Sequence, residues 1–182
     1  LQRLTNKYPS ITFTILSGNA DDIKWKIDNG LVDVGFLLEP TSTEKYNVEK
    51  IGFPERWMML TQSDSELAEL DEVSPEIFKK QRILISERPE VRQFIADWAD
   101  CQVSDLEIIG GFNLGFHLFE IARAGIGEAV VTEGALIRDY PDLKAIPLSP
   151  EVKTLSVLAW KKNIPLTPLT RAFIKQYLQD NE

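Results

Sequence analysis

The 182-residue sequence has little of what disulfide-stapled, secreted or membrane-spanning proteins depend on. Its one cysteine, Cys101, excludes a disulfide within the chain and fits a reducing compartment. No apolar run approaches the ~18 residues that a membrane-spanning helix needs, and no signal peptide opens the sequence. We therefore expect a cytoplasmic protein that does not enter a membrane. Because the first residues read as the end of a helix and no methionine precedes them, we also expect a fragment of a longer protein.

The sequence also lacks recognisable catalytic equipment. There is no GxGxxG after a strand, no Walker A loop, no HExxH and no CxxC. A Ser-His-Asp arrangement would have to use the only histidine, His117, which lies in an apolar stretch where a structural histidine is the common case. We expect no catalytic residues, no metal and no cofactor, so the sequence argues against an enzyme.

Positive charge is scarce relative to negative charge. The 20 Lys and Arg residues face 28 Asp and Glu residues, which gives a net charge of −8 and a pI of about 4.8. Since phosphate neutralisation needs clustered Lys and Arg, the chain by itself is not expected to bind nucleic acid. Its 43% hydrophobic and 26% charged residues are typical of a soluble globular protein with a core of good size.

Residues 8–36 predict a strand, a turn, a helix and a second strand. Ile11–Leu16 is a β-branched and aromatic run, and Leu31–Phe36 begins the next strand. Between them Asn19 stands as the N-cap of a helix. Its apolar stripe recurs at i, i+3 and i+7: Ala20, Ile23 and Ile27. Two strands joined by a helix must lie parallel in one sheet, and a ligand site is expected beyond their carboxyl ends.

Strands and helices alternate along the rest of the chain, which indicates an α/β fold in two lobes. Further strands are expected at 47–53, 56–61, 82–85, 106–109, 128–132 and 154–160, and further helices at 75–79, 89–98, 113–125 and from 168 onward. The acidic stretch 63–72 reads as the first boundary between lobes. The helix at 113–125 carries apolar residues on two sides, which either burial within the domain or a subunit contact would explain.

Four stretches, taken in order, resemble one family. They are Tyr8-Pro9 with the run that ends in NGLVDVGF (29–36), SDSELA (63–68), IARAGIGEAVV (121–131), and the helix at 165–173. Together they are similar to the effector-binding domain of LysR-type transcriptional regulators. Two positions depart from the family pattern, because Glu66 replaces a common proline and Thr132-Glu133 stands where the third stretch usually ends in proline.

The resemblance implies two Rossmann-like lobes joined by two crossover strands, like a type 2 periplasmic binding protein. Lobe I would comprise residues 1–62 plus 149–182, and lobe II residues 63–148, with the crossings near 56–61 and 154–160. Such domains have one more strand before residue 1, so the fold here would lack its first strand. They also follow a winged helix-turn-helix that is absent from this chain and makes the DNA contacts, and they form homodimers or higher homo-oligomers.

The effector is expected near three helix starts, because free backbone N–H groups and the positive end of the helix dipole lie there. The predicted effector-binding residues are Ser17, Asn19, Ser86, Arg88, Phe112 and Asn113. An inward Arg88 would pair a carboxylate bidentately, which points to a small anionic metabolite, although Glu87 beside it offsets the charge. The alternative is that these Ser and Asn residues only cap helices and turns, and that Arg88 is a surface charge.

Three functions remain open at this point. In the first, a ligand changes the geometry of the lobes and re-poses DNA-binding domains elsewhere in the protein. The second is a stand-alone solute-binding protein of the same fold, and the third is an enzyme on this scaffold. Fold alone does not decide among them.

Overall fold

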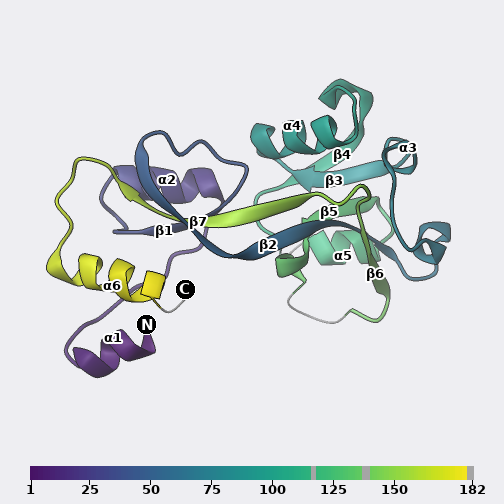
Figure 1. The fold of residues 1–182 in the computed structure, drawn as a ribbon. Helices are drawn as coiled ribbons and strands as arrows, with labels where there is room; N and C mark the ends of the chain where they lie inside the picture. The colour runs from purple at the N-terminus through teal and green to yellow at the C-terminus, as the bar shows by residue number, and fades with distance from the viewer. Residues whose placement is uncertain (116–117, 137–139, 180–182) are drawn as a thin grey trace. The chain divides into compact units, whose positions relative to one another are not determined.

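A computed structural model describes residues 1–115, 118–136 and 140–179 of the chain (Figure 1). The chain forms two compact units, unit 1 (Leu1–Phe53 with Leu155–Glu182) and unit 2 (Pro54–Thr154). Two strands that pair with each other, β2 (Tyr46–Gln62) and β7 (Lys153–Lys161), run through both units. The lobe limits expected from the sequence, after residues 62 and 148, stay a prediction.

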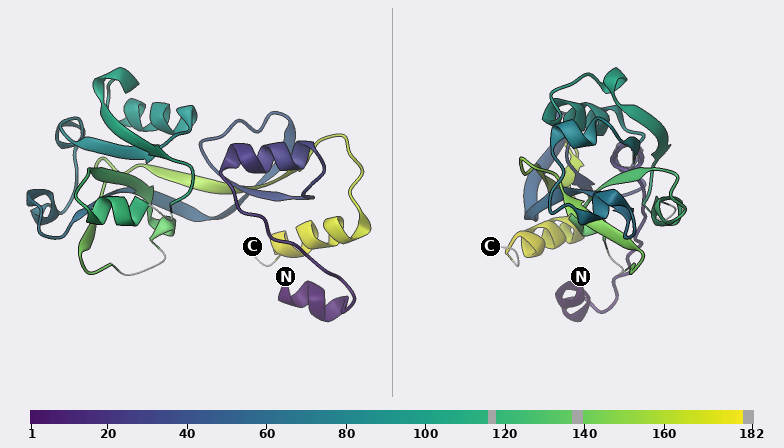
Figure 2. Two further views of the ribbon diagram at one scale, coloured as in Figure 1. Left: turned by 180° about the vertical axis from the view of Figure 1, so that it is seen from behind. Right: turned by 90° about the vertical axis from the view of Figure 1, so that its right-hand side faces the viewer.

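Unit 1 places a helix on each face of its sheet (Figure 2). Strand β1 (Gly35–Leu38) pairs antiparallel with β7. Helix α2 (Ala20–Asp28) packs on one face, where Ile23 and Ile27 are buried with Val157 and Ala159. Helix α6 (Pro168–Gln179) covers the other face through Ile174, which packs with Leu158. The short helix α1 (Gln2–Lys7) lies beside α6.

The predicted start of α2 is confirmed in atomic detail. Asn19 is the N-cap: its Oδ1 accepts a hydrogen bond from the backbone N–H of Asp22 at 2.9 Å. The Asp22 carboxylate in turn accepts the backbone N–H of Asn19 at 3.1 Å, which completes a capping box. Gly30, just beyond the helix, has φ +69°, a conformation that glycine adopts without strain.

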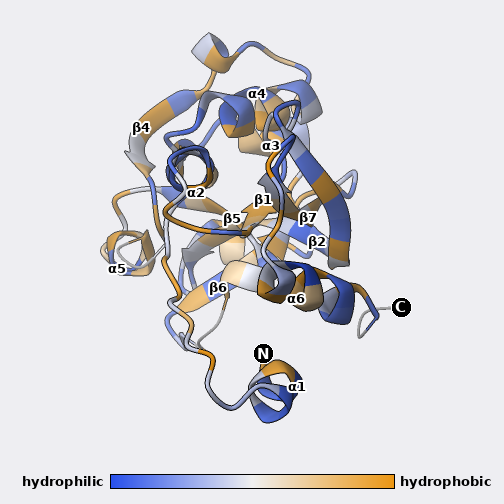
Figure 3. Cartoon of the chain, turned by 90° about the vertical axis from the view of Figure 1, so that its left-hand side faces the viewer, coloured by the Kyte–Doolittle hydropathy of each residue, from blue (hydrophilic) through white to orange (hydrophobic). Residues whose placement is uncertain are grey.

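The predicted strand at Ile11–Leu16 is wrong, because this segment has no regular secondary structure and pairs with no described strand. Among the described residues, the backbone of this segment makes one hydrogen bond, from the Ile11 N–H to the Tyr8 C=O at 3.1 Å. A strand exists only with a neighbour that satisfies its N–H and C=O groups, and a strand-like sequence does not provide one. Figure 3 shows the segment as an extended connection between α1 and α2 with hydrophobic stretches, and Phe13 and Ile15 are 55% and 72% exposed.

Unit 2 is a three-stranded parallel array extended by two antiparallel partners. The parallel strands are β5 (Glu128–Thr132), β3 (Arg82–Ser86) and β4 (Glu107–Phe112), in that order. Strand β2 pairs antiparallel with β5 on one side and with β6 (Leu143–Pro147) on the other. Short 3-10 turns lie at Glu66–Glu69, Val103–Asp105 and Glu133–Ala135.

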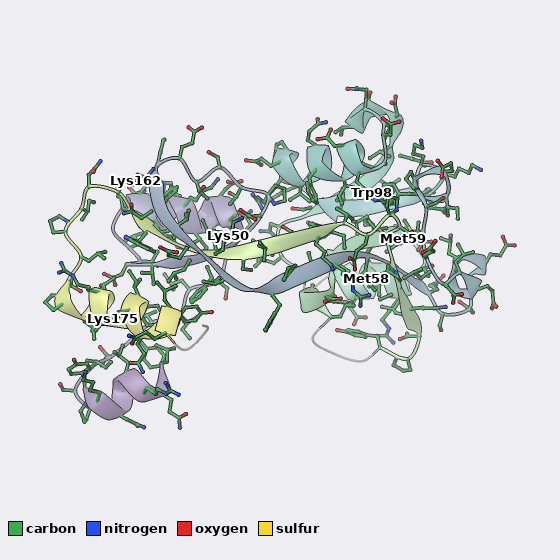
Figure 4. The ribbon with its side chains drawn as sticks, viewed as in Figure 1. Lys50, Met58, Met59, Trp98, Lys162 and Lys175 are labelled. Carbon is green, nitrogen blue, oxygen red and sulfur yellow. The ribbon has the colours of Figure 1, made fainter. Side chains whose placement is uncertain are left out.

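Helices cover both faces of this sheet. Helices α3 (Pro75–Phe78) and α4 (Pro89–Trp98) pack on one face in a core that includes Met59. Helix α5 (Leu118–Arg123) packs on the other face with Met58. Figure 4 labels these two methionines, which are consecutive on β2 and therefore enter opposite cores. No helix in the described ranges is long and apolar enough to cross a membrane.

Other predicted elements differ from the structure in extent. The strands expected at 47–53 and 56–61 form one continuous strand, β2, through Pro54. Among the described residues, the helix expected at 113–125 is formed by α5. Asn113 is not its cap, because Gly115, which follows Asn113, lies in a turn, and the Leu118 N–H donates to the Gly115 C=O at 3.2 Å. Phe119 in α5 is buried, and its ring stacks on that of Tyr140 with 4.8 Å between the ring centroids. Burial within the domain therefore explains this residue on the second apolar side of the expected helix. His117 lies outside the described residues.

Candidate functional site

The turn that follows β3 brings three of the predicted site residues together in unit 2. Ser86 ends β3 opposite Phe112, the last residue of the parallel strand β4. The backbone N–H of Glu87 donates to the Phe112 carbonyl at 3.0 Å, which holds the turn against β4. Ser86 Oγ accepts the backbone N–H of Arg88 at 3.4 Å. Ser86, Arg88 and Phe112 therefore share the carboxyl-terminal edge of two parallel strands, where α/β sheets bind ligands.

Arg88 is the N-cap residue of α4, and Pro89 occupies the first helical position. Proline fits there because the first N–H groups of a helix have no partner within the helix. The Arg88 side chain is only 6% exposed, so it is not the surface charge considered as an alternative. An arginine in this position adds a cation to the positive end of the α4 dipole, which favours a negatively charged ligand.

Arg92 is a second arginine at this edge, and the sequence-based prediction missed it. It lies one helical turn after Arg88, and its Nε donates to the Ser86 carbonyl at 3.0 Å. Arg88 is the N-cap residue and stands outside α4, so a spacing of four residues does not by itself place the two arginines on one helix face, and the sequence offers no local signal for Arg92. Both arginines therefore contact Ser86, one through its backbone N–H and the other through its guanidinium.

Strand β4 makes room for Arg92 at Gly111. A Cβ at this position would lie 2.8 Å from Arg92 Nη2 and 3.4 Å from the Cβ of Glu87. Because carbon atoms at that distance would overlap the guanidinium, any larger residue would displace Arg92. The strand expected at 106–109 therefore extends further than predicted, because Gly110 and Gly111 lie inside β4 and let the guanidinium approach the backbone.

The edge also carries an arginine whose charge is already balanced. Arg56 of β2 donates to Glu133, which follows β5, with 2.7 Å between Nε and Oε2. This hydrogen bond and the attraction to the carboxylate raise the pKa of Arg56. The neighbouring Glu55 accepts the backbone N–H of Gly134 at 3.2 Å. These contacts fix the segment after β5.

The other predicted residues are not part of this group. Ser17 is exposed and Asn19 caps α2, and both belong to unit 1. Asn113 is exposed directly after Phe112 in unit 2. The capping role of Asn19 is therefore certain, whereas contact of Ser17, Asn19 or Asn113 with an effector stays a prediction.

Taken with their connecting strands, the two units define a mixed α/β domain like the periplasmic binding proteins. The sequence model of the LysR substrate binding domain matches residues 1–181. The chain thus belongs to the family of LysR substrate-binding domains, which are regulatory domains of transcriptional regulators, and the resemblance noted in the sequence is confirmed.

Solved structures agree on the fold at low sequence identity. The regulatory domain of CcmR from Synechocystis PCC6803, in complex with 2-PG, has a TM-score of 0.81 at 15% identity, with 100% of this chain and 90% of that chain covered. The effector-binding domain of QuiR in complex with shikimate has a TM-score of 0.83 at 15% identity, with coverages of 99% and 87%.

Longer regulators of the family match as well. HinK, a LysR family transcriptional regulator from Pseudomonas aeruginosa, has a TM-score of 0.77 at 17% identity, with 98% of this chain and 63% of that chain covered. This chain thus spans less than two thirds of that regulator. No curated protein matches the sequence.

Proposed function

We propose that this chain is the ligand-sensing domain of a bacterial LysR-family transcriptional regulator and that it binds a small anionic metabolite. Binding would re-pose DNA-binding domains that belong to other parts of the full protein. A ligand does this only by binding one arrangement of the protein more tightly than another. Family membership and the neighbours solved with 2-PG and shikimate support a small-molecule ligand.

One observation carries the anionic character of the ligand: Arg88 is buried at the N-terminus of α4, beside Ser86. A guanidinium binds carboxylate or phosphate in a fixed, two-pronged geometry, and partial burial strengthens that interaction relative to water. The dipole of a ten-residue helix adds to it. The proposal keeps all six predicted contacts: Ser17, Asn19, Ser86, Arg88, Phe112 and Asn113.

The proposal includes sensing without catalysis, with no cofactor and no metal. DNA would be bound only through a domain outside this chain, and the regulator would act as a homodimer or a higher homo-oligomer. The stand-alone solute-binding protein, which the sequence left open, has no observation in its favour beyond the shared fold.

A thermal-shift screen against carboxylates, amino acids, sugar phosphates, aromatic compounds and inorganic anions tests the proposal. A ligand at a hundred times its Kd stabilises the folded state by about 2.7 kcal/mol, which raises Tm by several degrees. We expect hits among anions and loss of the shift in Arg88→Ala. Arg82→Ala, at the opposite end of β3 and 60% exposed, is the matched control.

The variant must be shown to fold, because Arg88 is buried. A circular dichroism spectrum and a Tm without ligand serve that purpose, and Ser86→Ala provides a milder change at the same turn. If folded Arg88→Ala and Ser86→Ala both bind an identified effector as tightly as the parent chain, the proposed site is wrong.

A further inference from the structure

Unit 1 contains a cavity that shares no residue with the Ser86 turn of unit 2. Its volume is about 530 Å³, which is within the range of small-molecule sites. Three chain segments border it: the end of α2, the turn before β2 and the end of β7. Half of the lining residues are lysines: the set is Asp28, Glu44, Lys45, Lys161, Lys162 and Asn163.

Two of these lysines are held in place by backbone carbonyl groups. Lys161 Nζ donates to the Asp28 carbonyl at 2.7 Å, and Lys162 Nζ donates to the Glu44 carbonyl at 2.6 Å. The backbone N–H of Lys162 also donates to the Lys45 carbonyl at 3.4 Å, which joins the end of β7 to the turn before β2. The two ammonium groups are therefore positioned before a ligand binds, and this lowers the entropy cost of binding.

The lining of the cavity has an excess of positive charge. Asp28 Oδ1 lies 3.7 Å from Lys161 Nζ, so these two side chains balance each other. Within the described ranges, Lys162 Nζ contacts a neutral carbonyl and no carboxylate, and the Lys45 ammonium group has neither a hydrogen-bond nor an ion-pair partner. The Glu44 carboxylate pairs with neither of them. Two uncompensated lysines therefore oppose one carboxylate in the cavity.

The distribution of charge along the chain also favours an anion in unit 1. This unit holds 10 Lys and Arg residues and 9 Asp and Glu residues, out of 20 and 28 in the whole chain. Unit 2 holds the remaining 10 and 19, so nearly all of the net charge of −8 belongs to it. A small anion that approaches the cavity is thus not repelled by the unit that contains it.

We propose that this cavity is a second ligand site, which binds the phosphate group of a small molecule or inorganic phosphate through Lys45 and Lys162. An ammonium group binds phosphate as a compact point charge with several N–H donors. The site is separate from the effector site proposed at the Ser86 turn, so neither proposal depends on the other. Under the competing explanation, the lysines only satisfy carbonyl groups at this end of the sheet.

Inorganic phosphate is the probe for this site. It is titrated at constant ionic strength and neutral pH into the isotope-labelled chain, while NMR follows the backbone amides of Tyr46 and Asn163. We expect saturable shifts at both amides. Lys45→Gln and Lys162→Gln should each lower the phosphate affinity about tenfold, because each removes one charge-assisted contact. Glu44→Gln should raise the affinity severalfold, because it removes the opposing charge.

The controls are two exposed lysines of unit 1 that do not line the cavity, Lys50 on β2 and Lys175 on α6. Figure 4 labels both of them together with Lys162, which follows β7. Lys50→Gln and Lys175→Gln change the net charge as Lys45→Gln does, yet they should leave the phosphate affinity within about twofold. Lys45 makes no side-chain contact among the described residues, so Lys45→Gln should keep the parent Tm.

Each outcome decides for or against the cavity. Weaker binding in Lys45→Gln and Lys162→Gln, with Lys50→Gln and Lys175→Gln unchanged, would support it. Equal weakening in all four variants would show attraction to net charge alone and would overturn it. The absence of a saturable shift at Asn163 would overturn it as well. A saturable shift confined to Ser86 would exclude this cavity as the phosphate site and leave the proposed function in place.

Discussion

The Oη of Tyr46 donates a hydrogen bond to Asp28 Oδ2 at 3.1 Å, and this joins the first residue of β2 to the last residue of α2. Lys161 of β7 completes the group by donating to the Asp28 carbonyl at 2.7 Å. Three elements of unit 1 thus meet at the end of α2, where carbonyl groups have no partner within the helix. This junction fastens α2 to the sheet in addition to the buried contacts of Ile23 and Ile27.

Tyr46→Phe should lower the free energy of unfolding by about 1 kcal/mol, the typical net value of one hydrogen bond. Burial, followed by the hydrogen bond to Asp28, raises the pKa of Tyr46 to about 12 from its ordinary 10.0. The stability that the hydroxyl contributes is then complete below pH 10 and is lost as the pH rises toward 12. Urea unfolding of both proteins between pH 8 and 12 measures this, and a constant difference would contradict it.

Glu128→Gln should make the protein more stable at neutral pH. Glu128 begins β5, and burial raises the pKa of its carboxyl group, against a smaller lowering effect of a hydrogen bond from Thr61. Since the folded state holds this proton more tightly than the unfolded state, stability falls as the pH rises from 4.5 through the raised pKa. The glutamine variant should lack this decrease. Thermal unfolding of both proteins from pH 4 to pH 8 checks it, and parallel curves would refute the role of Glu128.

Local sequence signals predicted helix ends well, because the groups that decide them are neighbours in the chain. Asn19 and Asp22 cap α2, Ser74 caps α3, and Thr167 Oγ1 accepts the N–H of Thr170 at the start of α6. The apolar stripe of α2 likewise predicted its buried face. The strand expected at 128–132 has the bounds of β5, because Gly127 directly precedes its short apolar run.

Features that depend on distant segments could not be predicted in this way. Ile11–Leu16 has the composition of a strand, but a strand also needs a neighbouring strand to pair with, and the composition of the segment does not show whether one is present. The position of the Arg92 guanidinium depends on Gly111, which lies beneath it and is distant in the sequence. The turn at Ser86–Arg88 was foreseen because proline and a preceding serine mark a helix start, whereas the burial of Arg88 follows from tertiary packing.

Gly127→Ala should destabilise the chain by roughly 1–3 kcal/mol, the usual cost of forcing an extra methyl group into a packed interior. Its Cβ would lie 2.7 Å from the backbone carbonyl oxygen of Arg82, which cannot move without disturbing β3. Gly115→Ala is the matched control, because nothing lies within 4 Å of a Cβ there. Chemical denaturation of the parent chain and the two variants measures the difference. Equal stability of Gly127→Ala and Gly115→Ala would show that β3 can shift to accept the methyl group at little cost.

Replacing Phe13 and Ile15 by serine should reduce self-association without loss of stability. These side chains are 55% and 72% exposed in a segment that makes no strand pairing, so the replacements remove few internal contacts and should change the free energy of unfolding by less than about 0.5 kcal/mol. Exposed apolar side chains on an extended segment instead favour contact with a second copy of the chain. Light scattering at micromolar concentration should therefore show a larger species for the parent chain than for Phe13→Ser/Ile15→Ser. Thr12→Ser and Thr14→Ser in the same segment keep the apolar side chains and serve as controls. A parent chain that is monomeric under these conditions, or a double variant that associates as strongly, would exclude this segment as an assembly surface.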